Sequence, residues 1–251
     1  MTRAALHVLQ FTDTHIFADE AQLFGGVNTR CSFLAARDKA LAERRRCDLI
    51  LITGDLAAQA DGGAYSWLAA QLLMFEVPIY CLPGNHDIGE VMQPLVCAAG
   101  WNFGGSLTIG GWQIVLLDST VRGEAYGHLT ASELGALDDA LARHPNLPTL
   151  VALHHQPVPI GSVWMDAMKL QDAARFWTVI DNYPQVRGVL WGHIHQNYDA
   201  FRHRVRLLAT PSTCVQFAAR SVDFAIDSLP AGFRWLRLSS GGDIATDVVR
   251  V

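Results

Sequence analysis

Five times along this 251-residue chain, a short apolar run is followed, at once or within a few residues, by Asp, Asn or His. Such runs are typical of buried strands, and the segments between several of them show helical spacing. In an α/β sheet the carboxyl ends of the strands meet at one edge, so residues far apart in sequence can share one crevice. The pattern therefore predicts an α/β fold with one polar site. The residues concerned are Asp13, His15, Asp55, Asn85, His86, His154, His193 and His195.

The first two thirds of the chain alternate predicted strands and helices, whereas short extended pieces follow Asn197. Gly110-Gly111 between two extended runs indicates a hairpin, and Thr130 with Glu133 is typical of a capping box. No repeat or linker interrupts the chain, so we expect a single domain over residues 1–251. The main strands are expected at 6–12, 48–53, 77–81, 112–118, 149–153 and 186–191, and the helices at 29–45, 64–75, 90–99, 130–143 and 171–183.

The composition narrows the class of protein. Half of the residues are apolar and 17% are charged, which favours a compact fold over disorder. A net charge of −5 disfavours nucleic acids and membrane surfaces as partners, and no run approaches the ~18 apolar residues of a membrane span. Five scattered cysteines and an N-terminal apolar run too short for a signal peptide predict a cytoplasmic protein with reduced thiols. The oligomeric state is not indicated.

The polar residues suit metal ions. An extended backbone sends residues i and i+2 to the same side, so Asp13 with His15 and His193 with His195 can each present two ligands to one centre. Imidazole, carboxylate and amide donors without thiolates favour Mn, Fe, Zn or Co over calcium. One ion cannot use so many ligands, whereas two ions that share a carboxylate can. We assign one ion to Asp13, His15, Asp55 and His195, and the other to Asp55, Asn85, His154 and His193.

Each of these residues alone has an ordinary explanation, because an Asp after a strand is often a turn or cap residue. It is the recurrence of the pattern at five strand ends that favours a metal site. The four histidines outside the pattern are expected to be structural; they are His7, His128, His144 and His203.

The motifs, in this order, resemble those of the calcineurin-like metallophosphoesterase family. They read Asp13-Thr14-His15, Gly54-Asp55, Gly84-Asn85-His86-Asp87, His154-His155-Gln156-Pro157 and Gly192-His193-Ile194-His195. Residues 11–17, 26–29 and 207–217 are also similar to the bacterial class III 3′,5′-cyclic-AMP phosphodiesterases. The resemblance implies a four-layer α/β/β/α sandwich of two mixed sheets, with a dinuclear site on loops at one edge.

The resemblance also implies a function, the hydrolysis of 3′,5′-cyclic AMP to 5′-AMP by a hydroxide that two metal ions share. Mn and Fe are the first expectation for the ions, with Zn or Co as alternatives. Asn85 and His86 are expected to be catalytic: Asn85 holds phosphoryl oxygens, and His86 donates a proton or contacts the phosphate. His195 is expected to contact substrate as well, and His155 either supports the ligands from behind or contacts substrate.

Other functions stay open. A 2′,3′-cyclic nucleotide phosphodiesterase, a glycerophosphodiesterase or a phosphomonoesterase could use the same metal site, and only the recognition loops would differ. The candidate loops are residues 24–28, the segment around Trp164 and residues 210–217. A non-catalytic scaffold of the same fold is disfavoured because every ligand position and His86 are filled. Neither a GxSxG elbow nor a GxxxxGK[ST] loop is present.

Overall fold

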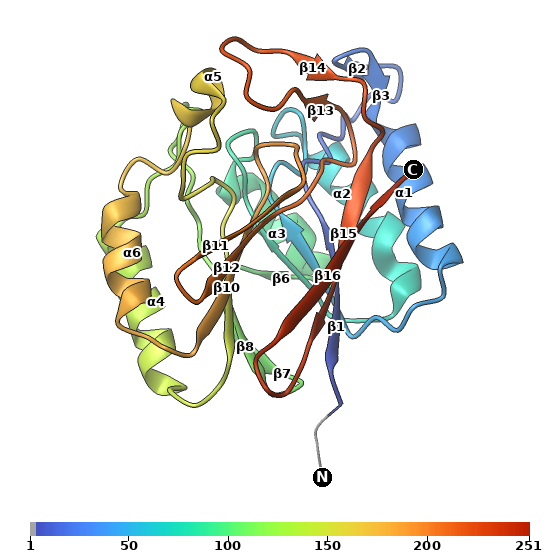
Figure 1. Ribbon diagram of the computed structural model, residues 1–251. Helices are drawn as coiled ribbons and strands as arrows, with labels where there is room; N and C mark the ends of the chain where they lie inside the picture. The colour runs from blue at the N-terminus through green and yellow to red at the C-terminus, as the bar shows by residue number, and fades with distance from the viewer. Residues whose placement is uncertain (1–3) are drawn as a thin grey trace.

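A computed structural model describes residues 4–251, so residues 1–3 of the expected domain lie outside the described chain. Two six-stranded mixed sheets form its centre, as Figure 1 shows. The first sheet has the order β16 (Ile244–Arg250), β15 (Gly232–Leu238), β1 (Leu6–Phe11), β4 (Leu49–Thr53), β5 (Ile79–Leu82) and β6 (Asn102–Phe103). The second has the order β11 (Tyr198–Arg202), β12 (Val205–Ala209), β10 (Val186–Trp191), β9 (Thr149–Ala152), β8 (Trp112–Leu116) and β7 (Gly105–Ile109).

Alternation along the strands sorts the apolar side chains into three layers. In β4, Leu49 and Leu51 pack between the two sheets, whereas Ile50 and Ile52 pack outward against helices. In the second sheet, Leu150 points to the centre and Val151 points outward. Successive side chains of a strand face opposite sides, so a central strand such as β4 is buried on both faces and is almost entirely apolar, whereas the edge strands β7, β11 and β16 alternate with exposed residues.

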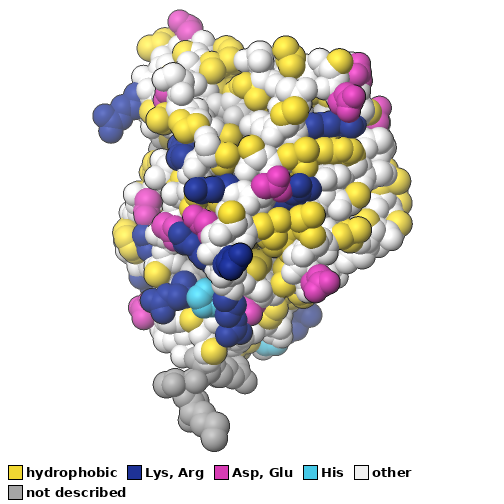
Figure 2. Space-filling model, turned by 90° about the vertical axis from the view of Figure 1, so that its right-hand side faces the viewer, with side chains coloured by type: hydrophobic (Ala, Val, Ile, Leu, Met, Phe, Trp, Pro, Cys, Tyr) yellow, Lys and Arg dark blue, Asp and Glu magenta, His cyan; other side chains and the backbone are white. Residues whose placement is uncertain are grey.

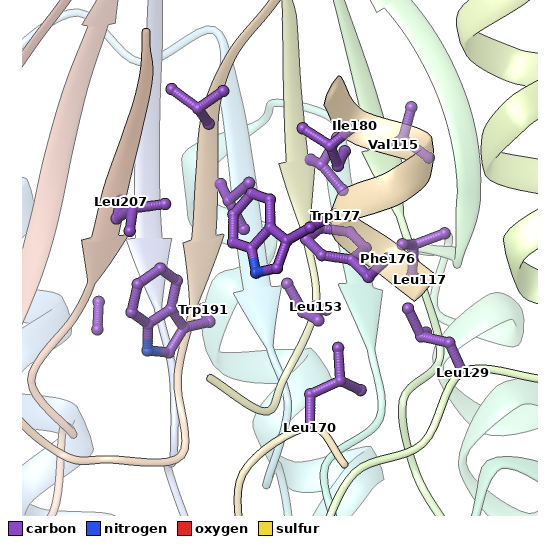
Figure 3. Close-up of a cluster of buried hydrophobic side chains, with 14 of the residues drawn as sticks. Val115, Leu117, Leu129, Leu153, Leu170, Phe176, Trp177, Ile180, Trp191 and Leu207 are labelled. Carbon is purple, nitrogen blue, oxygen red and sulfur yellow. The ribbon is translucent and has the colours of Figure 1, made fainter. Parts of the chain in front are cut away.

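Helices cover the two outer faces. The first sheet is covered by α1 (Thr29–Ala42), α2 (Gly62–Leu72) and α3 (Gly89–Ala98), with the 3-10 turn η1 (Leu73–Phe75) after α2. The second is covered by α4 (Ala131–Arg143) and α6 (Ala173–Asp181), and Figure 3 shows Phe176, Trp177 and Ile180 of α6 in that outer core. The predicted four-layer sandwich of two mixed sheets is therefore confirmed.

Several small elements were not predicted. They are the ribbon of β2 (Leu23–Phe24) with β3 (Val27–Asn28), the strand β6 and the short helix α5 (Val163–Asp166). A second ribbon, β13 (Gln216–Phe217) with β14 (Ile226–Asp227), lies within the short extended pieces that were expected after Asn197. The two ribbons and α5 lie together at the top of Figure 1. At the start of α4, Thr130 caps the helix, but Glu133 accepts a hydrogen bond from the Asp118 N–H, so only half of the expected capping box forms.

The surface carries both signs of charge. On the face in Figure 2, Lys and Arg side chains are interspersed with Asp and Glu. Among residues 4–251, no helix combines the length and the apolar character needed to cross a bilayer.

A buried arginine joins the two sheets. Arg234 of β15 donates hydrogen bonds from Nε to Thr210 Oγ1 (2.9 Å) and from Nη2 to Ala209 O (2.7 Å), at the end of β12 in the other sheet. Further bonds reach Asn197 Oδ1 and Thr246 Oγ1. Burial lowers the pKa of Arg234 to about 10, which leaves it charged at neutral pH, and no carboxylate in residues 4–251 forms an ion pair with it. Neutral oxygens therefore solvate this cation.

Replacing Arg234 by Met should lower the free energy of unfolding by about 2–4 kcal/mol, because the buried acceptors lose their donors. Urea denaturation measures the change. Arg46→Met is the matched control: its partner is the surface residue Asp48, so it should change stability by less than about 1 kcal/mol. Equal stability of the two variants would contradict the structural role of Arg234.

Candidate metal centre

The predicted site residues gather where the two sheets meet. The first sheet contributes the loops after β1, β4 and β5, and the second contributes the loops after β9 and β10. Both carboxylates and the four predicted histidine ligands are buried, and Asn85 and His86 are half-buried. The residues brought together are Asp13, His15, Asp55, Asn85 and His86 from the first sheet, and His154, His193 and His195 from the second.

The backbone at the ligands is left-handed. Asp13, His15, Asp55, His193 and His195 have φ values between 44° and 64°. Our explanation of the i, i+2 spacing by an extended strand was therefore wrong. The side chains do converge, but through turns in a conformation that costs a non-glycine residue about 1 kcal/mol or more.

One group of donors lies around His15 and His195. The Nε2 atoms of these two imidazoles are 3.2 Å apart, His195 Nε2 is 3.4 Å from Asp13 Oδ1, and His15 Nε2 is 3.6 Å from Asp55 Oδ2. Two nitrogens that each hold a lone pair toward the other need a cation or a proton between them. These four residues are the ones predicted for the first ion.

A second group lies around His154. Its Nε2 is 3.4 Å from Asp55 Oδ2 and 3.2 Å from Asn85 Oδ1. The His193 ring lies beside it with centroids 5.0 Å apart, and His193 Nε2 is buried with no hydrogen-bond partner among residues 4–251. Asp55 Oδ2 thus lies 3.6 Å from His15 Nε2 in the first group and 3.4 Å from His154 Nε2 in the second, as a bridging carboxylate would.

These spacings fit metal ions. At metal–ligand distances of about 2.0–2.2 Å, two ligands of one ion are separated by roughly 3.0–3.5 Å. The distances within both groups are in or close to that range, and the unpartnered His193 Nε2 has no other use in the described chain. Nitrogen and oxygen donors without thiolates suit Mn, Fe, Zn or Co.

The imidazoles are held in different ways. His154 Nδ1 lies 2.8 Å from Thr53 O, and His195 Nδ1 lies 2.8 Å from Val215 O, which leaves each Nε2 for the centre. His15 Nδ1 has no partner among the described residues. Its ring instead stacks on Phe24, with centroids 4.2 Å apart and planes within 10°. Phe217 stacks on His195 in the same way at 3.9 Å.

Close backbone contacts fix the loops. The Asp87 carboxylate accepts hydrogen bonds from the N–H groups of Leu56, Ala57 and Gly84, which ties the loop after β5 to the loop after β4. A Cβ at Gly84 would lie 2.2 Å from Asp55 Oδ1, and one at Gly192 would lie 2.1 Å from Thr12 Oγ1. Glycine is therefore required at both motif positions.

His86 and His155 have different settings. His86 Nδ1 lies 3.0 Å from Ala58 O, and its Nε2 is left for the cleft. His86 lines two cavities, one of about 200 Å³ over the metal-site residues and one of about 670 Å³ beside it. His155 is buried behind His193 and lines neither cavity; its Nδ1 lies 2.8 Å from Ser119 Oγ. The arrangement favours a supporting role for His155, and substrate contact stays a prediction.

The charges in the site perturb one another. Burial alone would lower the pKa of His154, but the carboxylates of Asp55 and Asp13 outweigh it and raise that pKa to about 9. Burial alone would raise the pKa of Asp55, but His154 and His86 hold it well below its usual range. Burial lowers the pKa values of His15, His155 and His193 well below 6.5.

Comparison with known proteins decides the family. Residues 6–197 match the family model described as Calcineurin-like phosphoesterase. The chain belongs to the calcineurin-like phosphoesterase family. A 3′,5′-cyclic-nucleotide phosphodiesterase of a Nostoc species is 40% identical over 246 residues, covering 98% of this chain and 92% of the relative. The 3′,5′-cyclic adenosine monophosphate phosphodiesterase CpdA of Escherichia coli K12 is 40% identical over 249 residues, covering 99% and 90%.

Solved structures show the same fold. A dimetal phosphatase from Danio rerio superposes with a TM-score of 0.69 at 15% identity and covers 98% of this chain and 99% of that one. The protein TT1561 of Thermus thermophilus gives a TM-score of 0.62 at 14% identity, covering 98% and 100%.

Sequence reasoning missed three supports of this phosphoesterase site. They are the rings of Phe24 and Phe217 on the predicted ligand imidazoles of His15 and His195, and the hydroxyl of Ser119 on His155. Phe24 and Phe217 belonged to candidate recognition loops, but no sequence signal indicated that they stack on His15 and His195. Both rings, together with Trp164 and Phe224, line the 200 Å³ cavity.

Without metal, the free energy of unfolding should fall as the pH drops from 6.5 to 5. The unfolded chain protonates His15, His155 and His193 near pH 6.5, whereas the folded protein keeps them neutral. Burial and the charge of Asp55 raise the pKa of Asp87 to about 6, so the folded state takes up one proton in return. His154, with a pKa of about 9, already holds its proton in the folded protein, which reduces the difference near pH 6.5. The difference therefore approaches two protons, roughly 2.7 kcal/mol per pH unit, near pH 5.

Urea denaturation in the presence of a chelator measures this slope. His155→Asn should reduce it by about one proton, whereas His203→Asn, at an exposed position, should leave it unchanged. A stability that does not vary between pH 5 and 6.5 would contradict the neutral state of the buried histidines.

Proposed function

We propose that this chain is a metal-dependent phosphodiesterase that hydrolyses 3′,5′-cyclic AMP to 5′-AMP, with residues 1–251 as one domain. The observation that carries the proposal is the convergence of two carboxylates, four imidazoles and an amide on one buried centre. The names of the relatives that match nearly the whole chain support the substrate.

Two metal ions would be held by these side chains. We assign Asp13, His15, Asp55 and His195 to the first and Asp55, Asn85, His154 and His193 to the second. Mn and Fe are proposed first, with Zn or Co as alternatives, because the donors are nitrogen and oxygen. When bound, the ions supply the positive charge that attracts a phosphodiester and activates water.

Asn85, His86 and His195 would contact the phosphate and the leaving group. The side-chain amide of Asn85 lies at the edge of the second group and can donate to a phosphoryl oxygen as negative charge develops there. His86 is oriented by Ala58 O and offers Nε2 to the departing ribose 3′-oxygen, to which it delivers a proton. His195 would contact the phosphate from the side of the first ion.

Aromatic rings line the cavity in which the adenine base would bind. Trp164, Phe217 and Phe224 pack edge to face with centroids 5.2–5.5 Å apart around the 200 Å³ cavity, and Phe224 is 59% exposed. Stacking on such rings stabilises a bound base by about 1–3 kcal/mol. We therefore place adenine against Trp164 and Phe224.

Location and partners follow the chemistry. We propose a cytoplasmic protein that acts on a small cyclic nucleotide; all five cysteines are free, which supports a reducing compartment. The mixed charges in Figure 2 offer no basic surface for a polynucleotide on that face.

The purified Mn-loaded protein should hydrolyse 3′,5′-cyclic AMP with a higher kcat/KM than 2′,3′-cyclic AMP, a glycerophosphodiester or p-nitrophenyl phosphate. The aromatic cavity should favour an adenine ester over the glycerophosphodiester and the monoester, and the position of His86 opposite the departing 3′-oxygen should favour the 3′,5′-cyclic ester over the 2′,3′-cyclic one. Product chromatography measures each rate. Faster turnover of the monoester would contradict the substrate assignment.

Two variants separate binding from chemistry. Asp55→Ala should lose bound metal and at least about 10³-fold in kcat, since both groups of donors share this carboxylate. His86→Asn should keep its metal, measured by elemental analysis, and lose about 10²–10⁴-fold in kcat. His203→Asn serves as the unaffected control. Full activity of Asp55→Ala would remove the two-metal assignment.

A further inference from the structure

The two cavities of the site share Asn85 and His86 and no other lining residue. The smaller one, of about 200 Å³, holds the metal-site residues and the aromatic rings. The larger one, of about 670 Å³, extends from the Asn85-His86 pair toward α3 and the loop after β8. Small-molecule sites usually have volumes of about 300–1,000 Å³, and the larger cavity is within that range.

A bound cyclic nucleotide would leave the larger cavity empty. Both ester oxygens of its phosphate belong to one ribose, so a nucleoside bound against Trp164 and Phe224 accounts for both arms of the diester. An acyclic diester differs, because its two arms belong to separate groups that point away from phosphorus. A phosphate placed beside Asn85 and His86 would have one cavity available for each arm.

The lining of the larger cavity indicates what the second arm is. The half-buried ring of Phe103 offers a stacking surface, and Gln93 and Glu90 of α3 offer polar atoms. Three carboxylates, those of Asp87, Glu90 and Asp118, and one guanidinium, that of Arg122, line the cavity, so the lining is negative on balance. Such a lining suits a neutral group with a flat ring and hydroxyls, which describes a nucleoside, and does not suit a second phosphate.

We propose that the site also hydrolyses 3′,5′-linked dinucleotides, with one nucleoside in the aromatic cavity and the other in the cavity lined by Gln93, Phe103 and Arg122. The proposal rests on the proposed phosphodiesterase function. A dinucleotide with free ends carries a single negative charge, so the net charge of −5 opposes it far less than it opposes a polynucleotide.

The reaction balances as follows for adenylyl-3′,5′-adenosine. Water attacks phosphorus and forms a new P–O bond while the P–O3′ bond breaks, and its electron pair stays on O3′. His86 delivers its proton to that oxygen, and the proton lost by the attacking water passes to solvent. Adenosine leaves through the larger cavity, and 5′-AMP remains in the aromatic one.

Adenylyl-3′,5′-adenosine and 3′,5′-cyclic AMP should be compared as substrates of the Mn-loaded protein, with chromatography of the products. We expect equal amounts of adenosine and 5′-AMP, at a kcat/KM within about tenfold of that for the cyclic ester. Gln93→Trp replaces a lining side chain by a bulky ring and should narrow the larger cavity. The ratio of kcat/KM for the dinucleotide over that for cyclic AMP should fall at least about tenfold.

Val91→Trp is the matched control, because Val91 is an exposed residue of the same helix and lies outside both cavity linings. It should leave the ratio unchanged. Asp55→Ala, purified in parallel, should cleave neither ester, which excludes a contaminating nuclease. Equal melting temperatures of the two Trp variants show that folding is unaffected.

The outcomes separate the two proposals. Turnover of cyclic AMP without cleavage of the dinucleotide would overturn the two-cavity inference and leave the proposed function intact. Cleavage of the dinucleotide without turnover of cyclic AMP would overturn the proposed cyclic-AMP substrate and leave the two-cavity inference intact. Equal losses on both substrates in Gln93→Trp would mean that the larger cavity serves the cyclic nucleotide, which also overturns the inference.

Discussion

The structure depends on burying two carboxylates, Asp13 and Asp55, at the edge where the two sheets meet. Burial of a charge is costly unless donors and opposite charges surround it. Asp13 accepts hydrogen bonds from the His193 N–H and from Thr12 Oγ1, and Asp55 accepts one from the His86 N–H. These donors come from loops of both sheets. The polar centre is therefore built by the same backbone turns that close the sandwich, and neither sheet could form it alone.

The left-handed backbone at five predicted ligands follows from this requirement. A strand that continued in extended form would carry Asp13 or His193 past the edge of its sheet. A left-handed residue turns the chain back, so the backbone N–H of His193 reaches Asp13 and that of Asp13 reaches Gly54 O. Strain of this kind persists only where the surroundings over-determine it, and it is typical of functional sites. Here the hydrogen bonds between the loops hold these residues in the left-handed conformation.

The main strands, the helices and the members of the site could be predicted because each has a local signal, either a period or a polar residue at the end of an apolar run. Other features have none. Two-residue strands such as β2 and β6 are too short for a period, and the stacking of Phe24 on His15 depends on where a ribbon folds in space. Glu133 has the spacing of a capping box, yet a tertiary contact with Asp118 takes its carboxylate. Left-handed turns bring residues i and i+2 to one centre, as an extended strand would. The spacing of two residues therefore could not distinguish the two backbone conformations.

The position of the donors also depends on contacts deep between the sheets. Gln10 of β1 donates to Thr53 Oγ1 and accepts from Thr210 Oγ1, which in turn accepts from Arg234. The carbonyl oxygen of Thr53 lies against His154 Nδ1. A buried cation with no carboxylate partner in residues 4–251 is thus linked, through neutral groups, to the imidazole of His154, which lies 3.4 Å from the Asp55 carboxylate. Because Arg234 and Gln10 are on the first sheet and Thr210 and His154 are on the second, this chain of bonds sets the separation of the sheets at the point where they share the metal-site residues. The distance between Asp55 and His154 is therefore a property of the whole sandwich and not of one loop.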